Sequence, residues 1–230
     1  MSAALVVGVI DSGVHADHPH IRAVAAGAAF DHNGRADPNP DCVDRLGHGT
    51  AVAAAIQDLA PGVQICPLRV FDRQLDAPVA TLVAAIDWAA GHGLPLVNLS
   101  LGTADRAHEA KLAEAVGRAH AAGTIVVAAG SDDGIDWLPG SLGVQGVIRA
   151  ELDWSCPRGA HTADDAGSAP IFRTCGYPRT IPGVDPARNL KGLSFAVANV
   201  SGSAAQAMIE TDLRGYEALL NVLYQRARRA

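Results

Sequence analysis

The chain has 230 residues, of which 49% are hydrophobic and 4% aromatic, and its formal net charge is −6. This length is enough for a large core, so we expect residues 1–230 to form a single domain. The negative charge argues against nucleic acid as a partner, and no apolar run approaches the ~20 residues that cross a bilayer, which argues against a membrane partner. No oligomeric state is indicated.

The cysteines and the N-terminus bear on the compartment. Cys42, Cys66, Cys156 and Cys175 show no CxxC spacing, so we expect no metal site built on them, and we expect no cofactor. The first residues, MSAALVVGVIDSG, lack the basic start of a signal peptide. We therefore expect a cytoplasmic protein with reduced thiols, in which a Cys156–Cys175 disulfide is disfavoured.

The first predicted element is a strand at residues 5–10, which is apolar throughout and fits a parallel strand buried on both faces. Asp11 follows it directly. Side chains at the carboxyl end of such a strand are well placed for chemistry, although an Asx-turn that closes the strand is the simpler alternative. A metal site built from Asp11, His15 and His18 is a minor alternative, because Pro19 interrupts the helical spacing that ligand pairs use.

A polar loop at residues 31–46 leads to Gly-His-Gly-Thr at 47–50 and then to an alanine-rich helix that ends at Pro61. His48 is thus predicted at the start of a helix, between two glycines that leave it accessible. This placement suits a histidine that meets a substrate, and the alternative is a loop histidine without a role.

Strands and helices alternate through the rest of the chain. Further strands are predicted at 63–71 (interrupted by Pro67), 96–100, 124–129 and within 137–150, and further helices at 80–90, 107–122 and 216–229. Residues 153–191 show little periodicity and are predicted to be a long loop region that frames a cleft. The alternation predicts an α/β fold with three layers: a mostly parallel, doubly wound sheet with helices on both faces.

One more helix is predicted at residues 192–209, which read GLSFAVANVSGSAAQAMI and are apolar on most faces. Ser194 lies in its first turn, where backbone N–H groups are unpaired and negative charge is favoured. A serine at this position is either a helix cap or a nucleophile, and caps are the commoner case.

Three motifs now stand in order: Asp-Ser-Gly at 11–13, Gly-His-Gly-Thr at 47–50, and Gly-x-Ser-x-Ala at 192–196. Together they strongly resemble the subtilisin-like serine peptidases. In that family the catalytic residues are known to occur in the order Asp, His, Ser along the chain. The resemblance covers roughly residues 5–210. It implies an endopeptidase in which Ser194 attacks the peptide bond, His48 acts as general base and Asp11 orients the imidazole, with an acyl-enzyme intermediate.

The resemblance also implies a cleft in which an extended peptide pairs with the strand at 96–100 by β-augmentation. The substrate-binding residues expected from it are Asp76, Leu99, Ser100, Leu101, Gly102, Ala129 and Gly130. Asp132 and Asp133 are weaker candidates, for the rim of a pocket that selects a basic side chain.

The sequence departs from the family pattern at several positions. Ser131 stands where the family has the asparagine that donates to the oxyanion, so we expect its shorter hydroxyl to serve as a weaker donor. Ala198 and Asn199 replace a proline and a histidine. The loop before residue 63 is too short for the family's high-affinity calcium site, which predicts a calcium-independent enzyme.

Two functions remain open from the sequence. The first strand begins about five residues into the chain, which leaves no room for an N-terminal propeptide. An unrestrained protease would harm a cytoplasm, so we expect narrow specificity for a precursor peptide or protein. The alternative is a weak or inactive peptidase-like module that binds extended peptides, and it is motivated by Ser131.

Overall fold

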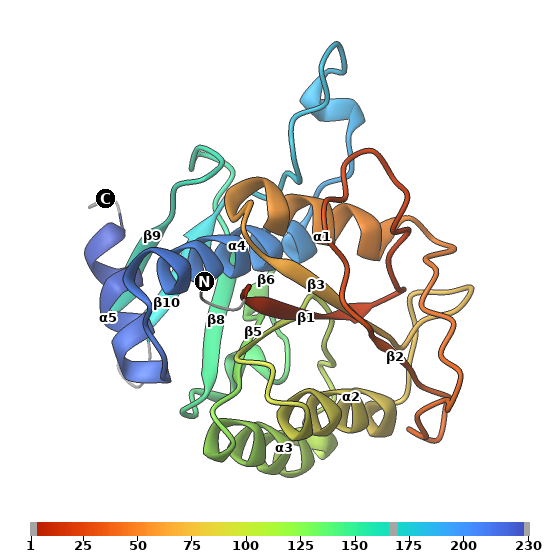
Figure 1. The fold of residues 1–230 in the computed structure, drawn as a ribbon. Helices are drawn as coiled ribbons and strands as arrows, with labels where there is room; N and C mark the ends of the chain where they lie inside the picture. Colours follow the sequence, from red (N-terminus) through yellow and green to blue (C-terminus); the bar gives the residue numbers. More distant parts are fainter. Residues whose placement is uncertain (1–3, 166–169, 228–230) are drawn as a thin grey trace.

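A twisted sheet with helices on both faces forms the centre of the computed structural model, which describes residues 4–165 and 170–227 (Figure 1). Within these residues eight strands form the sheet, in the order β2-β3-β1-β4-β5-β8-β10-β9. All neighbours are parallel except β9 and β10. The strands are β1 (Val6–Asp11), β2 (Ala28–Ala29), β3 (Gln64–Arg69), β4 (Leu96–Leu99), β5 (Ile125–Ala129), β8 (Val147–Leu152), β9 (Thr162–Asp165) and β10 (Pro170–Thr174), and a separate hairpin joins β6 (Ser131–Asp132) to β7 (Ile135–Asp136).

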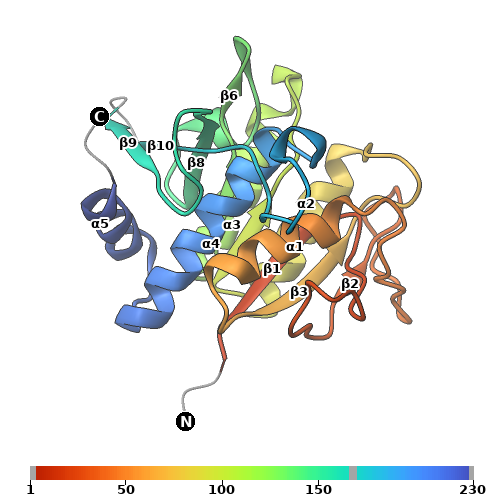
Figure 2. The ribbon, with the colours of Figure 1, turned by 90° about the horizontal axis from the view of Figure 1, so that it is seen from above.

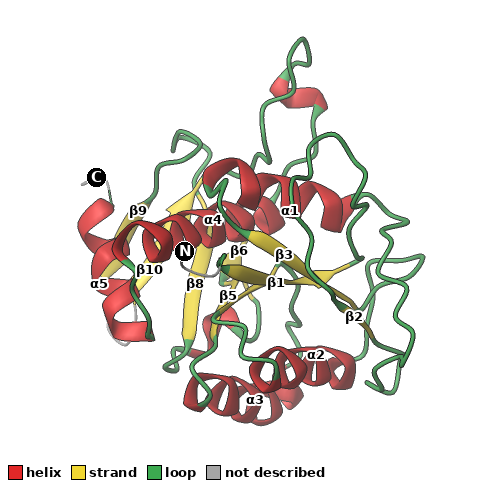
Figure 3. Cartoon of the chain, viewed as in Figure 1, coloured by secondary structure: helices red, strands yellow, loops and turns green. Residues whose placement is uncertain are grey.

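The helices form the two outer layers (Figures 1 and 3). One layer holds α1 and α4, which cross the sheet side by side when it is seen from above (Figure 2), with α5 packed against α4. The other layer holds α2 and α3. Their bounds are α1 (His48–Leu59), α2 (Val79–Gly91), α3 (Glu109–Ala121), α4 (Leu193–Thr211) and α5 (Tyr216–Arg226), and short 3₁₀ turns lie at η1 (Arg106–His108), η2 (Gly140–Leu142) and η3 (Pro186–Arg188). The predicted three-layer α/β architecture is confirmed.

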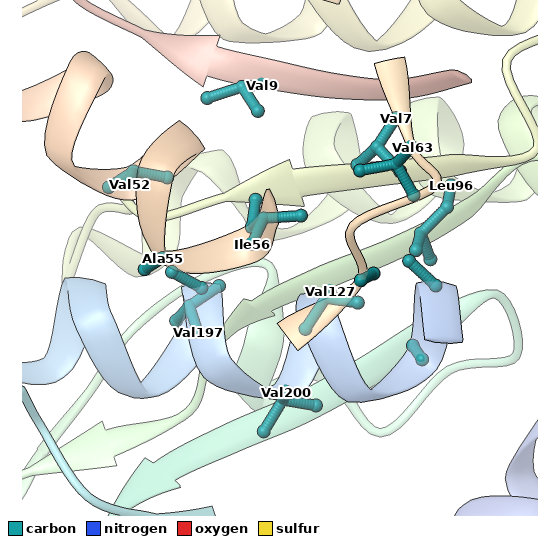
Figure 4. Close-up of a cluster of buried hydrophobic side chains, with 14 of the residues drawn as sticks. Val7, Val9, Val52, Ala55, Ile56, Val63, Leu96, Val127, Val197 and Val200 are labelled. Carbon is teal, nitrogen blue, oxygen red and sulfur yellow. The ribbon is translucent and has the colours of Figure 1, made fainter. Parts of the chain in front are cut away.

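The alternation of side chains along the strands explains both layers. Val7 and Val9 of β1 point to the α1–α4 layer, and Ile10 packs among residues of the α2–α3 layer. All three side chains are fully buried, and burying each contributes about 2 kcal/mol. Figure 4 shows how Val52 and Ile56 of α1 reach the same cluster. Two buried faces are the reason that β1 is apolar at nearly every position.

Two predictions from the sequence need correction. Residues 153–191 are not loop throughout, because β9 and β10 lie within them and β10 extends the sheet beside β8. Ile171 and Phe172 are the buried hydrophobic residues of β10, and two such residues are too few for periodicity to reveal the strand. Pro67 does not interrupt β3, where it pairs with Val9 near the edge of the sheet.

The connections between strands and helices determine where the candidate site lies. Residues 60–63 alone join α1 to β3, as expected from the short loop in the sequence. The carboxyl ends of β1, β4 and β5 lie together at one edge of the sheet, since these neighbours are parallel. Among the described residues, no helix is long and apolar enough to span a bilayer.

Candidate active site

A buried aspartate and a histidine meet at the carboxyl end of β1. Asp11 is fully buried, and the Nδ1–H of His48 donates to its Oδ1 at 2.8 Å, with Oδ2 at 3.0 Å. The Ser12 backbone N–H also donates to Oδ1, at 2.8 Å. A carboxylate that accepts from Nδ1–H selects the tautomer whose Nε2 is an acceptor. His48 therefore presents a basic nitrogen on its other side.

The electrostatics of the pair favour imidazolium. Burial of the His48 ring opposes its protonation, but the hydrogen bond and the charge of Asp11, together with the charge of Asp44, outweigh burial and raise the pKa of His48 above 6.5. The ring is still partly open, with 17% of its side chain exposed. Such a histidine can accept a proton from a neighbouring group and hold it.

Asp44 fixes the loop that carries His48, and sequence reasoning missed it. Its Oδ1 accepts from the Ser12 hydroxyl (2.8 Å) and from the N–H groups of Leu46 and Gly47 (both 2.9 Å). Its Oδ2 accepts from the N–H (2.9 Å) and the hydroxyl (2.6 Å) of Thr50. Burial would raise the pKa of Asp44, but these donors outweigh burial and lower it. Gly47 adopts the left-handed conformation (φ 82°) at the start of α1, which is why a glycine precedes His48.

Ser194 lies at the start of α4, close to the histidine. The hydroxyl of Ser194 donates to the carbonyl of Ser100 at 3.2 Å, and the hydroxyl of Ser100 donates to the carbonyl of Ser194 at 3.1 Å. The ring of the next residue, Phe195, lies 5.6 Å from the His48 ring between centroids. The structure therefore brings together the end of β1, the start of α1 and the start of α4, which carry Asp11, His48 and Ser194.

A buried polar chain holds Ser100 against α4. The Asn98 amide donates to the Ser100 hydroxyl at 2.7 Å, and the Ser201 hydroxyl donates to Asn98 Oδ1 at 3.0 Å. Asn98 and Ser201 are both fully buried. Asparagine in an otherwise apolar strand was the signal in the sequence for this network, because a buried amide needs partners.

The segment after β4, and not β4 itself, is open to a peptide. Leu99 pairs with Ile10 on one side and Ala128 on the other, and its side chain is fully buried. The prediction that Leu99 binds substrate is therefore wrong, because no edge of β4 is unpaired there. Beyond the strand, Leu101 and Gly102 have no backbone hydrogen-bond partner within residues 4–165 and 170–227, so Ser100–Gly102 can pair with an extended chain.

The other predicted binding residues differ in how accessible they are to a peptide. Ala129 is buried at the end of β5. The Gly130 N–H donates to Ala150 and its C=O accepts from Trp137, so its backbone is already paired. Asp76 lies on an exposed loop and lines a hollow with Arg45 and Arg69, to which none of Asp11, His48 or Ser194 contributes.

Ser131, the predicted oxyanion donor, is engaged by charged neighbours. Its hydroxyl donates to Asp136 Oδ1 and accepts from Arg149 Nη2 at 2.7 Å. A hydroxyl has one proton, so in this arrangement Ser131 has none to spare for a substrate. The assignment of Ser131 as a weaker oxyanion donor stays a prediction, and it requires the hydroxyl to give up its hydrogen bond to Asp136.

The metal alternative gains no support. His15 and His18 line a hollow of about 330 Å³ beside α1 with Arg179, while Asp11 is bound to His48. In the described part of the chain, no three His, Cys, Asp or Glu side chains are grouped so as to hold a metal ion. Cys156 and Cys175 are not joined by a disulfide.

Comparisons with known proteins identify the family of the chain. The model of the subtilase family matches residues 2–166. Subtilisin DY of Bacillus licheniformis is 29% identical over 218 residues, which cover 86% of this chain and 74% of that protein. The thermostable alkaline protease of Halalkalibacterium halodurans is 31% identical over 218 residues, or 86% of this chain and 55% of that protein.

The fold has solved counterparts as well. The crystal structure of the nisin leader peptidase NisP from Lactococcus lactis superposes with a TM-score of 0.75 at 21% identity, covering 100% of this chain and 84% of that one. This likeness shows the fold. Because the family model matches more than half of the chain, the chain belongs to the subtilase family and is a subtilisin-like serine endopeptidase.

Proposed function

We propose that Asp11, His48 and Ser194 are the triad of this peptidase. The observation that carries the proposal is the hydrogen-bonded Asp11–His48 pair, whose imidazole lies beside the helix turn that bears Ser194. Ser194 Oγ attacks the peptide carbonyl and its proton passes to His48 Nε2. Asp11 stabilises the imidazolium, which then protonates the leaving amine. In the second half of the reaction, water attacks the acyl-enzyme and gives its proton to His48. The imidazolium then returns a proton to Ser194 Oγ, which releases the acyl group.

The resting hydrogen bond of Ser194 fits this sequence of steps. Its proton points to the Ser100 carbonyl, so the proton must turn to His48 before attack. Catalytic hydrogen bonds are often loose in unliganded enzymes and tighten when substrate binds. The position of Ser194 in the first turn of α4 also leaves its backbone N–H free of an intrahelical partner, which makes it a donor for the oxyanion.

We further propose that the substrate is an extended segment of a precursor peptide or protein, bound along Ser100–Gly102 and cleaved with narrow specificity. Main-chain pairing holds any extended peptide, and side-chain pockets select among them. The nisin leader peptidase NisP has this fold, so the fold accommodates such a task. We place the enzyme in the cytoplasm, which the buried thiols of Cys66 and Cys175 favour.

The test is a pair of measurements on the wild type and Ser194→Ala. A fluorophosphonate probe should label the wild type and leave Ser194→Ala unlabelled, and a peptide-library digest should show cleavage at a few related sites by the wild type alone. Equal cleavage by both proteins would refute the triad. Cleavage at most bonds of the library would refute narrow specificity, and cell fractionation tests the location.

The engagement of Ser131 favours one second candidate, a module that binds extended peptides without cutting them. The Ser131 hydroxyl donates its hydrogen bond to Asp136, so one of the expected oxyanion donors is occupied in the absence of substrate. In that case the wild type and Ser194→Ala bind peptide equally and neither releases product. Turnover by the wild type excludes this candidate.

A further inference from the structure

A cluster of charged side chains surrounds Ser131 at the carboxyl end of β5. Arg149, on the neighbouring strand β8, donates from Nη2 to the Ser131 hydroxyl and from Nε to Glu151 Oε1 at 2.7 Å. Glu151 also accepts from the Ser131 N–H at 3.2 Å. The same guanidinium and the same carboxylate thus bind the side chain and the backbone of Ser131.

The position of Arg149 is built into the fold. The Glu151 side chain is only 8% exposed and that of Arg149 24%, so the pair is largely withdrawn from water. A Cβ at Gly130 would lie 2.6 Å from Arg149 Cγ and Nε, so any larger residue there would have to displace the Arg149 side chain from β5. Arg173, on β10, donates to the other Glu151 oxygen at 3.0 Å but is not a partner of Ser131.

Charge and hydrogen bonding at Ser131 have a chemical consequence. An N–H from Arg149 occupies one lone pair of Oγ, so the hydroxyl is oriented to donate elsewhere and its O–H is polarised. The acceptor at rest is Asp136, whose side chain is 48% exposed and which is also paired with Arg106 at 3.2 Å. An oxyanion that forms near Ser131 would compete with Asp136 for this proton.

We propose that Arg149 is a positioning residue for catalysis, which holds the Ser131 hydroxyl as a switchable oxyanion donor in place of the family's asparagine. This rests on the proposed triad. As the tetrahedral intermediate forms, the Ser131 hydroxyl turns its hydrogen bond from Asp136 to the oxyanion. The hydrogen bond from Arg149 to Ser131 Oγ persists. Asp136 is therefore a competitor that weakens the donor at rest.

The experiment is a double-mutant cycle between Arg149→Met and Ser131→Ala, with kcat and KM measured on a peptide that the wild type cleaves. We expect Arg149→Met to lower kcat by about 10- to 100-fold with little change in KM, because the oxyanion exists only in the transition state. In the Ser131→Ala background, Arg149→Met should cause no further loss. Arg173→Met is the matched control, since it removes a partner of the same Glu151 without touching Ser131, and should stay within about twofold of the wild type.

A second variant keeps the proposal testable if Arg149→Met does not fold. Asp136→Ala, at an exposed site, should raise kcat by up to about tenfold, which corresponds to one charge-assisted hydrogen bond no longer competing. Three results would each overturn the proposal while the triad stands. They are additive losses in the cycle, a loss in Arg173→Met equal to that in Arg149→Met, and a fall in kcat for Asp136→Ala. A wild type that neither reacts with fluorophosphonate nor cleaves peptide would overturn the triad, and this inference with it.

Discussion

Asp44→Asn tests whether the loop before α1 is held by one buried carboxylate. The substitution keeps the size of the side chain but turns one oxygen into an NH₂ group. In the better orientation, the amide oxygen keeps the three donors now bound to Oδ1, and the NH₂ faces the N–H and hydroxyl of Thr50. The hydroxyl can turn away, whereas the buried N–H cannot. One lost hydrogen bond and one unsatisfied buried donor together cost about 2–3 kcal/mol.

The assay is urea unfolding at neutral and acidic pH, with the exposed Asp17→Asn as a control for the change in charge. The Asp44 pKa is lowered in the folded protein, so its contribution is present above about pH 3.8 and is lost as the pH falls through the folded pKa. Asp44→Asn should lack this acid-dependent component. We also expect kcat to fall, since Asp44 holds the residues that flank His48. A free energy of unfolding within about 0.5 kcal/mol of the wild type would refute the reasoning.

Three further predictions concern His48, Gly130 and Asn98. His48 must be neutral to act as a base, and its pKa is raised above the ordinary 6.5, so kcat/KM should rise with pH through a region above pH 6.5. In a pH–rate profile, Asp11→Asn should shift this rise to lower pH and reduce kcat on the order of 10⁴-fold. Gly130→Ala places a methyl group 2.6 Å from Arg149 and should lower the free energy of unfolding in urea by about 1–3 kcal/mol; an unchanged value would contradict the tight fit of Arg149 against β5. Asn98→Ala should cost about 2–4 kcal/mol and lower kcat, because it removes the partner that Ser100 and Ser201 share; an unchanged melting temperature would contradict this.

Local features predicted that Asp11, His48 and Ser194 lie at the ends of strands and helices, whereas their catalytic roles were expected only from the resemblance of the three motifs to a family. A buried strand ends at Asp11, and α1 and α4 begin at His48 and Leu193. Parallel topology then brings these ends to one edge of the sheet. The same logic misled at Leu99, since an apolar strand shows that it is buried but does not show that both of its edges are already paired.

What the sequence did not reveal depends on pairing across long separations. Asp44 meets Ser12 across 32 residues, and nothing in a polar loop distinguishes an anchoring aspartate from the solvated ones around it. The Ser131 cluster depends on β5 and β8 lying side by side with Ala128 opposite Arg149. Without that register, an arginine in a strand reads as an exposed residue and not as a partner of Ser131.

The composition of the chain and the geometry of the site are connected through α1 and α4. These helices carry His48 and Ser194, so the distance between them sets how closely the two groups approach. A Cβ at Gly202 would lie 2.9 Å from the Cβ of Leu59, a contact so tight that any larger residue must push the helices apart. A glycine at position 202 therefore allows α1 and α4 to pack closely at this crossing.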